Sequence, residues 1–345
     1  MTGMAVAGLT VIGAAGAPAA SGAAARATAT PAFQLAKHGN DAPRAYIGSD
    51  GRIAFVRKGN IYSVKPNGKG LRRLTRSGGA SGPRWSPNGA QLAYLDRGNL
   101  WIMNADGSHK TQITRSAPSS SIARPSWSPN GAFLAFVRTR RHHRVGLLTM
   151  YDTSRHLVAT LADAAGPITA LPAPVAWSQA NDGHGDTSFI LYEGAGPRCV
   201  RPMKYCLDIV AYPAFGDTTS GTTSLEYAST TRIRLTDPDW RPSGAALPPL
   251  SGNILTTMEN CAFSPCRHAG LLLTIPTAHP PVPILRGAYE GAYAPIGANV
   301  VFVRNRRGVP QVYTGTVGQG GGVSGLRRIG PGSQPDWQPV APFPP

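Results

Sequence analysis

A repeated motif constrains the fold of this chain more than any other feature of its sequence. The segment Pro83–Tyr94 reads PRWSPNGAQLAY and recurs as PSWSPNGAFLAF at Pro125–Phe136, so that Trp127 follows Trp85 by 42 residues. Each copy leads into an alternating apolar run, a short polar turn and a second apolar run. Alternation punctuated by Asn-Gly and Asp-Gly predicts antiparallel hairpins, because these dipeptides accept the positive φ angles of tight turns. Four short strands in roughly 40–50 residues form the unit of a β-propeller blade.

Weaker copies of the motif allow the blades to be counted. Further openings begin at Pro174, Pro238, Tyr293 and Pro335. The first unit, from Ile53, lacks its opening strand, and the last opening strand has no unit behind it. The sequence therefore predicts an all-β fold, a six-bladed β-propeller of four-stranded blades over residues 46–339. The C-terminal strand around Trp337 is expected to complete the first blade and close the ring, which removes exposed strand edges.

The composition agrees with a β-rich chain. Of the 345 residues, 41 are Gly and 32 are Pro, whereas there are only six Lys and four Glu, the residues that usually cover the solvent faces of helices. A long helical bundle and a coiled coil are therefore disfavoured. The hydrophobic content of 41% allows a sizeable core and argues against wholesale disorder.

The N-terminal residues resemble a targeting segment. Residues 1–25 carry no charge, the stretch from Val6 to Ala20 is apolar apart from Thr10, and small residues precede Arg26. We predict a signal peptide over residues 1–27, with an N-terminal anchor as the alternative, because the usual basic residues do not precede the apolar stretch. Residues 28–45 read as a flexible linker and residues 340–345 as a tail. The expected location is exported, in the periplasm or cell envelope or secreted.

The four cysteines support export, because they fall into two close pairs. Cys199 with Cys206 and Cys261 with Cys266 predict two short-loop disulfides behind an apparent signal peptide. Zinc bound by these thiols, with His268, is the alternative, but the spacings fit no zinc motif well.

The repeats resemble those of the TolB family of propellers, built from WD40-like units with a Trp-Ser-Pro-Asp-Gly opening. Trp85–Gly89 and Trp127–Gly131 carry this opening, with Asn in place of Asp. The resemblance is specific over residues 53–161 and degenerate afterwards. It implies an extracytoplasmic six-bladed propeller that acts as an interaction scaffold, without naming a partner.

Basic residues gather in the predicted turns between the second and third strands of four blades. Strands alternate in direction, so these turns are expected on one face of the ring, on blades one, two, three and six, which are consecutive. We call the following ten residues the basic rim: Arg57, Lys58, Arg97, Arg138, Arg140, Arg141, Arg144, Arg304, Arg306 and Arg307. Such an arc would attract anions, with guanidinium groups binding phosphate or carboxylate. The alternative is that these arginines are ordinary solvated surface charges.

Motifs of catalysis are absent from the sequence. It contains no Gly-x-Ser-x-Gly elbow, no phosphate-binding loop and no His-Glu-x-x-His. His142-His143 lies among arginines, and Asn181–Asp186 lacks the terminal Glu of a calcium loop. We therefore predict no catalytic residue, no metal site and no cofactor.

These observations lead to a first and a second prediction of function. The first is an exported, non-catalytic TolB-like propeller that acts as a protein-interaction and binding scaffold in the cell envelope or outside it. Its partner would be an envelope or extracellular protein, or an anionic polymer or lipid surface; nucleic acid is disfavoured by export. The alternative is a propeller enzyme, hydrolase or lyase, with a site in the central channel. A closed ring has no open edges to cover, so we expect a monomer.

Overall fold

The structure, a computed structural model, describes residues 49–115, 118–163, 166–178, 187–194, 206–213, 222–225, 233–240, 254–262, 265–274, 282–318 and 322–340. The described residues form strands joined by turns and contain no α-helix. No helix there is long and apolar enough to cross a membrane. The predicted signal peptide or anchor, linker, Cys199 and Asn181–Asp186 lie outside the described residues.

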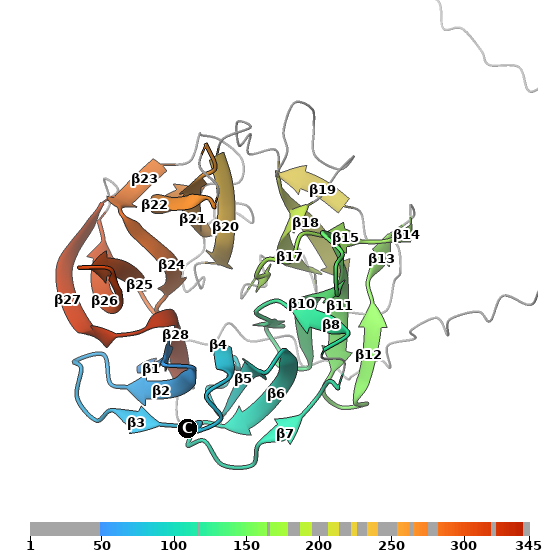
Figure 1. Cartoon of the computed structure of the whole chain (residues 1–345), viewed down its shortest axis with the longest axis horizontal. Helices are drawn as coiled ribbons and strands as arrows, with labels where there is room; N and C mark the ends of the chain where they lie inside the picture. The colour runs from blue at the N-terminus through green and yellow to red at the C-terminus, as the bar shows by residue number, and fades with distance from the viewer. Residues whose placement is uncertain are drawn as a thin grey trace, which may run out of the picture. The chain divides into compact units, whose positions relative to one another are not determined.

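Small antiparallel sheets make up the fold, and four of them have four strands (Figure 1). The sheet that contains both ends of the described chain is β28 (Ser333–Val340), β1 (Ser49–Arg57), β2 (Asn60–Val64) and β3 (Arg72–Arg73). The next is β4 (Ala80–Trp85), β5 (Gln91–Asp96), β6 (Asn99–Asn104) and β7 (Thr111–Gln112). The other two are β20 (Ile233–Trp240), β21 (Ile254–Asn260), β22 (Arg267–Thr274) and β23 (Val282–Arg286), and β24 (Ala288–Tyr293), β25 (Asn299–Arg306), β26 (Val309–Val317) and β27 (Val323–Pro331).

The middle of the chain forms one larger sheet in place of two separate ones. Ten strands belong to it: β8 (Ser120–Ile122), β9 (Ser126–Trp127), β10 (Phe133–Arg140), β11 (Gly146–Asp152), β12 (Leu157–Thr160), β15 (Thr169–Ala170), β16 (Ala176–Trp177), β17 (Thr187–Gly194), β18 (Cys206–Pro213) and β19 (Thr222–Leu225). The short strand β15 joins the predicted third and fourth blades, because it pairs with both β11 and β17. The hairpin of β13 (Ala162–Asp163) and β14 (Gly166–Pro167) precedes this joint.

The C-terminal strand pairs with the first strand, as the sequence predicts. Ile53 lies opposite Trp337 and Ala54 opposite Asp336 in the β1–β28 ladder. Contacts then run from sheet to sheet in a closed circle: β28 with β4, β4 with β9, β9 with β16, β16 with β20, β20 with β24, and β24 with β28. The described part of the chain is therefore a propeller-like arrangement of small sheets, in which β4, β20, β24 and β28 face the middle (Figure 1).

The core lies between neighbouring sheets, so successive side chains of a strand pack against different neighbours. Ile53 and Phe55 pack against Val301 and Val312 of the β24–β27 sheet. Ala54, which points to the other face of β1, packs against Trp85 and other residues of the β4–β7 sheet. The central strands β5 and β10 are therefore apolar along most of their length, whereas the outer strands β3 and β27 are mostly exposed and carry arginines.

The repeated turn of the motif forms the same hydrogen bonds in both copies. The Oγ atoms of Ser86 and Ser128 each donate to the Asn two residues later, at 2.7 Å. The same two Oγ atoms accept from the backbone N of Gln91 and Phe133, at 2.9 Å. The side chains of a Ser-Pro-Asn-Gly sequence thus form the hydrogen bonds of the first hairpin turn of a repeat. The motif can be recognised in the sequence because these bonds join residues that are close together in the chain.

Candidate functional site

The innermost strands share a bulge at the same place in the repeat. It lies three residues before the repeat aromatic, the name we give to Trp85, Trp127, Trp177, Trp240, Tyr293 and Trp337. The register shifts there in β4, β20, β24 and β28. The residues at the bulge have positive φ angles: Gly82 (57°), Asp237 (49°), Glu290 (50°) and Gln334 (51°). A left-handed conformation is unfavourable for residues other than Gly, Asn and Asp, so Glu290 and Gln334 at this position in two sheets indicate a role for their side chains.

Side chains of the innermost strands bond to the backbone of the next sheet. In three repeats, the residue before the repeat aromatic accepts a hydrogen bond from the backbone N of the next repeat aromatic. This occurs from Trp85 N to Asp336 Oδ2 (2.6 Å), from Trp177 N to Ser126 Oγ (2.9 Å) and from Tyr293 N to Asp239 Oδ2 (2.8 Å). Two of these bonds connect different sheets, and the bond from Trp177 to Ser126 connects two parts of the ten-stranded sheet, so these side chains hold the ring together.

A second row of such bonds joins the bulges. Gln334 N donates to Glu290 Oε2 (2.6 Å), and Gly82 N donates to Gln334 Oε1 (2.8 Å). We name Arg84, Ser126, Asp239, Glu290, Gln334 and Asp336 together the inner girdle. The indoles of Trp127 and Trp240 add further ties by donating to backbone carbonyls of the preceding repeat opening, Arg84 O (3.0 Å) and Ala176 O (3.2 Å).

Arg84 compensates the charge of the two girdle aspartates. Its Nη1 lies 2.8 Å from Asp336 Oδ1 and 3.2 Å from Asp239 Oδ1, and its side chain is 7% exposed. Burial opposes the charge on Arg84, but Asp336 and Asp239 outweigh it, so the pKa of this guanidinium is raised. The Nε and Nη2 atoms of Arg84 are buried without a hydrogen-bond partner in the described part of the chain.

A second buried arginine, Arg124, pairs with a bulge residue. Its Nη2 lies 3.4 Å from Asp237 Oδ1. Burial and the nearby charge of Arg84 lower the pKa of Arg124, against the opposing effect of Asp237 and Glu290. Burial and the charge of Asp237 raise the pKa of Glu290. The centre of the ring therefore contains both signs of charge in close contact, with more carboxylates than guanidinium groups.

Asp239 gives the ring a pH dependence that can be measured. Burial raises its pKa to about 6, against the lowering effect of Arg84. The folded protein therefore keeps the Asp239 proton between about pH 4 and pH 6, where the unfolded chain has lost it, so this group lowers stability as the pH rises through that window. We expect the free energy of unfolding of Asp239→Asn, relative to the wild type, to improve by about 2 kcal/mol between pH 4 and pH 7. Urea denaturation at both pH values tests this, and an unchanged difference would contradict it.

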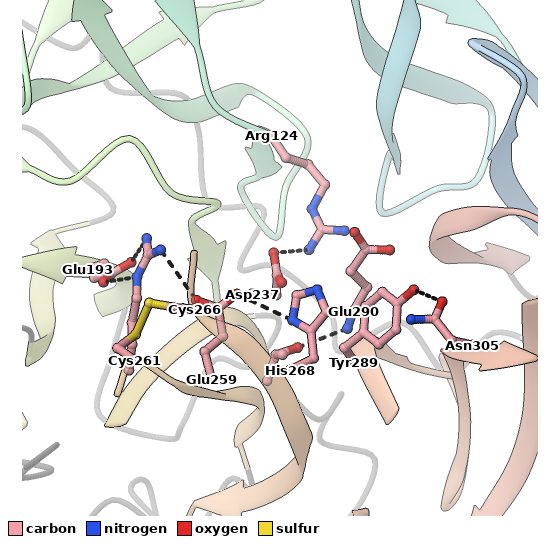
Figure 2. A network of polar contacts seen from close by, with 12 residues as sticks. Arg124, Glu193, Asp237, Glu259, Cys261, Cys266, His268, Tyr289, Glu290 and Asn305 are labelled. Carbon is pink, nitrogen blue, oxygen red and sulfur yellow. Dashed lines mark hydrogen bonds and ion pairs between the residues drawn. A yellow bond between two sulfur atoms is a disulfide. The ribbon is translucent and has the colours of Figure 1, made fainter. Parts of the chain in front are cut away.

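A further polar network extends from the girdle toward the β21–β22 hairpin (Figure 2). Arg234 binds Glu193 through two hydrogen bonds of 2.6 and 2.7 Å and lies 3.4 Å from Glu259. His268 Nδ1 lies 3.3 Å from Glu259 Oε1, and the imidazole stacks on Tyr289 with ring centroids 4.1 Å apart. We name Glu193, Arg234, Glu259, His268, Tyr289 and Asn305 the His268 network; Tyr289 OH donates to Asn305 Oδ1 at 2.8 Å.

The electrostatics of this network favour a charged His268. The hydrogen bond to Glu259 raises the pKa of His268, and the same bond lowers the pKa of Glu259. Burial raises the pKa of Glu193, opposed by its bonds to Arg234. A carboxylate on Nδ1 fixes the imidazole, an arrangement that can orient a histidine for proton transfer.

One of the two predicted disulfides is confirmed. Cys261 and Cys266 are bonded, with a Cα–Cα distance of 4.2 Å, in the turn between β21 and β22. Glu259 offers a carboxylate oxygen near both sulfurs. Because the sulfurs are bonded to each other, they are not thiolate ligands, and the zinc alternative does not apply to this pair. The bond between Cys199 and Cys206 stays a prediction, since Cys199 is outside the described residues.

The disulfide closes a short loop, so its effect on stability is limited. The cysteines are separated by five positions in the sequence. We expect replacement of both by Ser to lower the free energy of unfolding by about 2 kcal/mol. Chemical denaturation under non-reducing conditions measures the difference; a loss larger than about 4 kcal/mol would show that the bond does more than close this loop.

The basic rim lies where the sequence places it, at hairpins between the second and third strands of their sheets. Lys58 is in the turn between β1 and β2, Arg97 between β5 and β6, and Arg307 between β25 and β26, with Arg57, Arg304 and Arg306 in the adjoining strand ends. Arg138 and Arg140 end β10, and Arg141 and Arg144 follow before β11.

The inner girdle and the His268 network are the features that the sequence analysis missed. Glu193, Glu259 and Glu290 are far apart in the sequence and come from three different sheets, on β17, β21 and β24. The available signal was a charged residue between Pro and the repeat aromatic, in an otherwise apolar strand, as at Asp239 and Asp336.

Comparison with known proteins gives a clear result for the fold. No family model matches the sequence, and no curated protein matches it. Among solved structures, TolB from Acinetobacter baumannii aligns with a TM-score of 0.50 and 14% identity over 86% of this chain and 67% of its own. A candidate TolB from Agrobacterium tumefaciens aligns with 0.53 and 15% over 83% and 92%.

A chain in a crystal structure of a nidogen/laminin complex aligns with a TM-score of 0.58 and 6% identity, over 84% of this chain and 99% of that chain. At such identities the likeness concerns the fold. Together with the repeated Trp-Ser-Pro-Asn-Gly turns and the β1–β28 closure, it shows that the chain has a TolB-like β-propeller fold.

Proposed function

We propose that the chain is an exported six-bladed β-propeller that binds another macromolecule and has no catalysis of its own. Six blades follow if the ten-stranded sheet supplies two of them, one on each side of β15. Two ties support this division. The repeat aromatic Trp177 bonds to Ser126 through its backbone N, and its ring stacks on Phe133 with centroids 6.4 Å apart. The hydrogen bond is of the kind found between separate sheets elsewhere in the ring, at Trp85 and Tyr293.

The observation that supports a binding role is that the carboxylates of the inner girdle and the cations of the basic rim have different surroundings. The girdle carboxylates of Asp239, Glu290 and Asp336 accept hydrogen bonds from the backbone of the next sheet, so they maintain the ring. The rim cations, in contrast, lie at hairpin ends, where most of them are exposed. A rigid ring with charged turns on one face is suited to contact with another large molecule.

Export is supported by the disulfide between Cys261 and Cys266, since such bonds persist in oxidising compartments. The nidogen/laminin neighbour comes from a complex between proteins, and by analogy we propose an envelope or extracellular protein as one class of partner. An anionic polymer or lipid surface is the other class, because the formal net charge is +17.

One observation favours the alternative, an enzyme with its site at the ring's centre. His268 is fixed by Glu259 at Nδ1 and stacks on Tyr289, and carboxylates from several sheets lie nearby (Figure 2). If His268 were a general acid or base, His268→Gln would abolish turnover of a substrate without changing the affinity of the ring for a macromolecule.

Affinity capture from an envelope extract tests the proposed function. The baits are the full chain and a charge-reversed variant with Arg140, Arg141, Arg306 and Arg307 each changed to Glu. We expect the wild type to capture a macromolecule that the variant does not. A variant that reverses Lys65, Lys69 and Arg72 to Glu serves as the control, since these exposed residues lie at or beside the turn between β2 and β3, at the other end of their sheet. If none of the three baits captures a macromolecule, the proposed binding role is contradicted.

A further inference from the structure

Three hairpins of the basic rim share an unusual turn. Each has a two-residue loop with a cation followed by glycine: Lys58-Gly59, Arg97-Gly98 and Arg307-Gly308. The φ angles of the three cations are 49°, 49° and 51°, and those of the glycines are 65°, 78° and 77°. Positive φ at both central residues defines a type I′ turn. In the fourth rim hairpin, His142 also has a positive φ angle, of 67°.

The first position of a type I′ turn favours Asn, Asp or Gly, which tolerate the left-handed conformation. A lysine or arginine is unfavourable there, and nothing in the fold requires its charge. The side chains of Lys58, Arg97 and Arg307 are exposed and form no hydrogen bond or ion pair within the part of the chain that the structure describes. Three sheets thus keep a cation at a turn position that Asn would stabilise better, which points to a role outside the fold.

Hydrogen bonds show that the rim hairpins are neighbours on one face. Gly59 O accepts from Ala80 N (2.8 Å), and Gly79 O accepts from Arg97 N (3.1 Å), so the segment that enters β4 bridges the first two turns. On the other side of β1, Gly332 N donates to Pro310 O (3.0 Å) beside the Arg307 turn.

A Cβ placed on that same Gly332 would lie 2.8 Å from Val56 O, close to the Lys58 turn. In the fourth rim hairpin, Arg141 N donates to Ser119 O (2.9 Å), as Arg97 N donates to Gly79 O in the second. The three type I′ turns are therefore neighbours in one arc, and the arc extends to the fourth hairpin because β6, which follows the Arg97 turn, contacts β8.

Aliphatic side chains accompany the cations at both ends of this arc. Val309 follows the Arg307-Gly308 turn and is 49% exposed. Val145 and Leu147 follow Arg144 and are each 39% exposed. Cations interspersed with exposed aliphatic groups fit the interface of a bilayer, where both kinds of side chain find partners.

We propose that the basic rim docks this protein onto an anionic lipid bilayer. The inference rests on the proposed function, and names the partner of the rim. Hairpins at equivalent positions of consecutive sheets can meet one flat surface together. Lys58, Arg97 and Arg307 would approach lipid phosphates, while Val145, Leu147 and Val309 would enter the headgroup region. A hydrated soluble polyanion could use the cations but offers nothing to the aliphatic side chains.

The turns supply a variant that separates binding from folding. Replacing Lys58, Arg97 and Arg307 together by Asn removes three charges and creates three Asn-Gly turns, the preferred sequence for type I′. We expect its thermal midpoint to rise by about 2–5 °C. The matched control replaces Lys65, Lys69 and Arg72 by Asn, which removes the same charge at or beside the turn between β2 and β3.

The experiment measures co-sedimentation of the full chain with vesicles. The readout is a ratio of two affinities, that for vesicles of equal parts phosphatidylglycerol and phosphatidylcholine divided by that for pure phosphatidylcholine vesicles. Taking this ratio removes any contribution of the N-terminal apolar segment. We expect this ratio to fall about 100-fold when Lys58, Arg97 and Arg307 are all replaced by Asn. In the control variant it should fall no more than about fivefold. Equal losses in the two variants, or no preference of the wild type for anionic vesicles, would overturn the proposal.

Two further arms distinguish the lipid surface from other anions and from other partners. Val145→Asn with Val309→Asn is expected to weaken vesicle binding while leaving the affinity for soluble polyphosphate unchanged; equal effects on both would overturn the lipid assignment. If the wild type ignores anionic vesicles but captures a macromolecule through Arg140, Arg141, Arg306 and Arg307, the lipid proposal fails and the proposed function stands. If both fail, the rim has no binding role.

Discussion

Truncation of the chain after Pro331 is expected to abolish the cooperative unfolding transition of the ring. This deletion removes β28, the antiparallel partner of β1, and leaves one edge of β1 without hydrogen bonds. It also removes Trp337, which is 6% exposed and packs against Ile53 and Phe55. Loss of a buried tryptophan alone costs about 3–5 kcal/mol, against a total stability of about 5–15 kcal/mol for a typical domain.

Circular dichroism during heating and size-exclusion chromatography measure the outcome. We expect a broad transition and aggregates, because the open ring exposes both an apolar sheet face and a strand edge. Truncation after Val340 is the control, since it leaves β28 intact. A peptide of residues 332–340 added in trans should restore a cooperative transition, and the same peptide with Trp337→Ala should not. A cooperative melt of the truncated chain at the wild-type midpoint would contradict the closure argument.

The second large effect is expected from Arg84→Met. This variant leaves the carboxylates of Asp239 and Asp336 buried without their shared cation, although both still accept backbone hydrogen bonds. Removal of one partner from a buried ion pair is strongly destabilising, and we expect the free energy of unfolding to fall by about 3–5 kcal/mol at pH 7. Methionine matches the length of the arginine stem, so the loss of charge dominates over the loss of packing.

Urea denaturation measures this change, with Arg72→Met, an exposed arginine of β3, as the control within about 0.5 kcal/mol of the wild type. Adding Asp239→Asn and Asp336→Asn to Arg84→Met should recover part of the loss, because the amides carry no charge and can still accept from Tyr293 and Trp85. A loss below about 1 kcal/mol for Arg84→Met would show that the two aspartates do not depend on it.

The features that the sequence predicted are those set by neighbouring residues. The Ser-Pro-Asn-Gly turn closes on itself through Ser86, Asn88 and Gln91, so its hydrogen bonds can be anticipated from a dozen residues. The hairpins of the basic rim were predicted for the same reason. The closure of β28 on β1 is distant in the sequence, but it followed from counting repeats, because a missing first strand and a surplus last strand complement each other.

The features that the sequence analysis missed depend on where the ring places distant residues. Arg84 meets Asp239 across 155 positions and Asp336 across 252. Neither pair can be identified until the order and closure of the sheets are known, since the ring alone brings the innermost strands together. The joint at β15 was also missed, because two residue pairs with β11 and one with β17 leave no periodic pattern.

The ties between sheets also bear on how such a ring could have grown. In each tie that uses the residue before the repeat aromatic, one sheet supplies a side-chain oxygen and the next supplies only a backbone N–H. The receiving sheet is therefore free to vary in sequence, as the change from Trp to Tyr293 illustrates. A copy of a repeat with Ser or Asp before its aromatic would carry its own acceptor and would find a donor in its successor, whereas Arg84, Ala176 and Ala292 stand at this position in the other three repeats. A copy of the first kind could thus be inserted and then diverge without a matching change in the sheet that follows it.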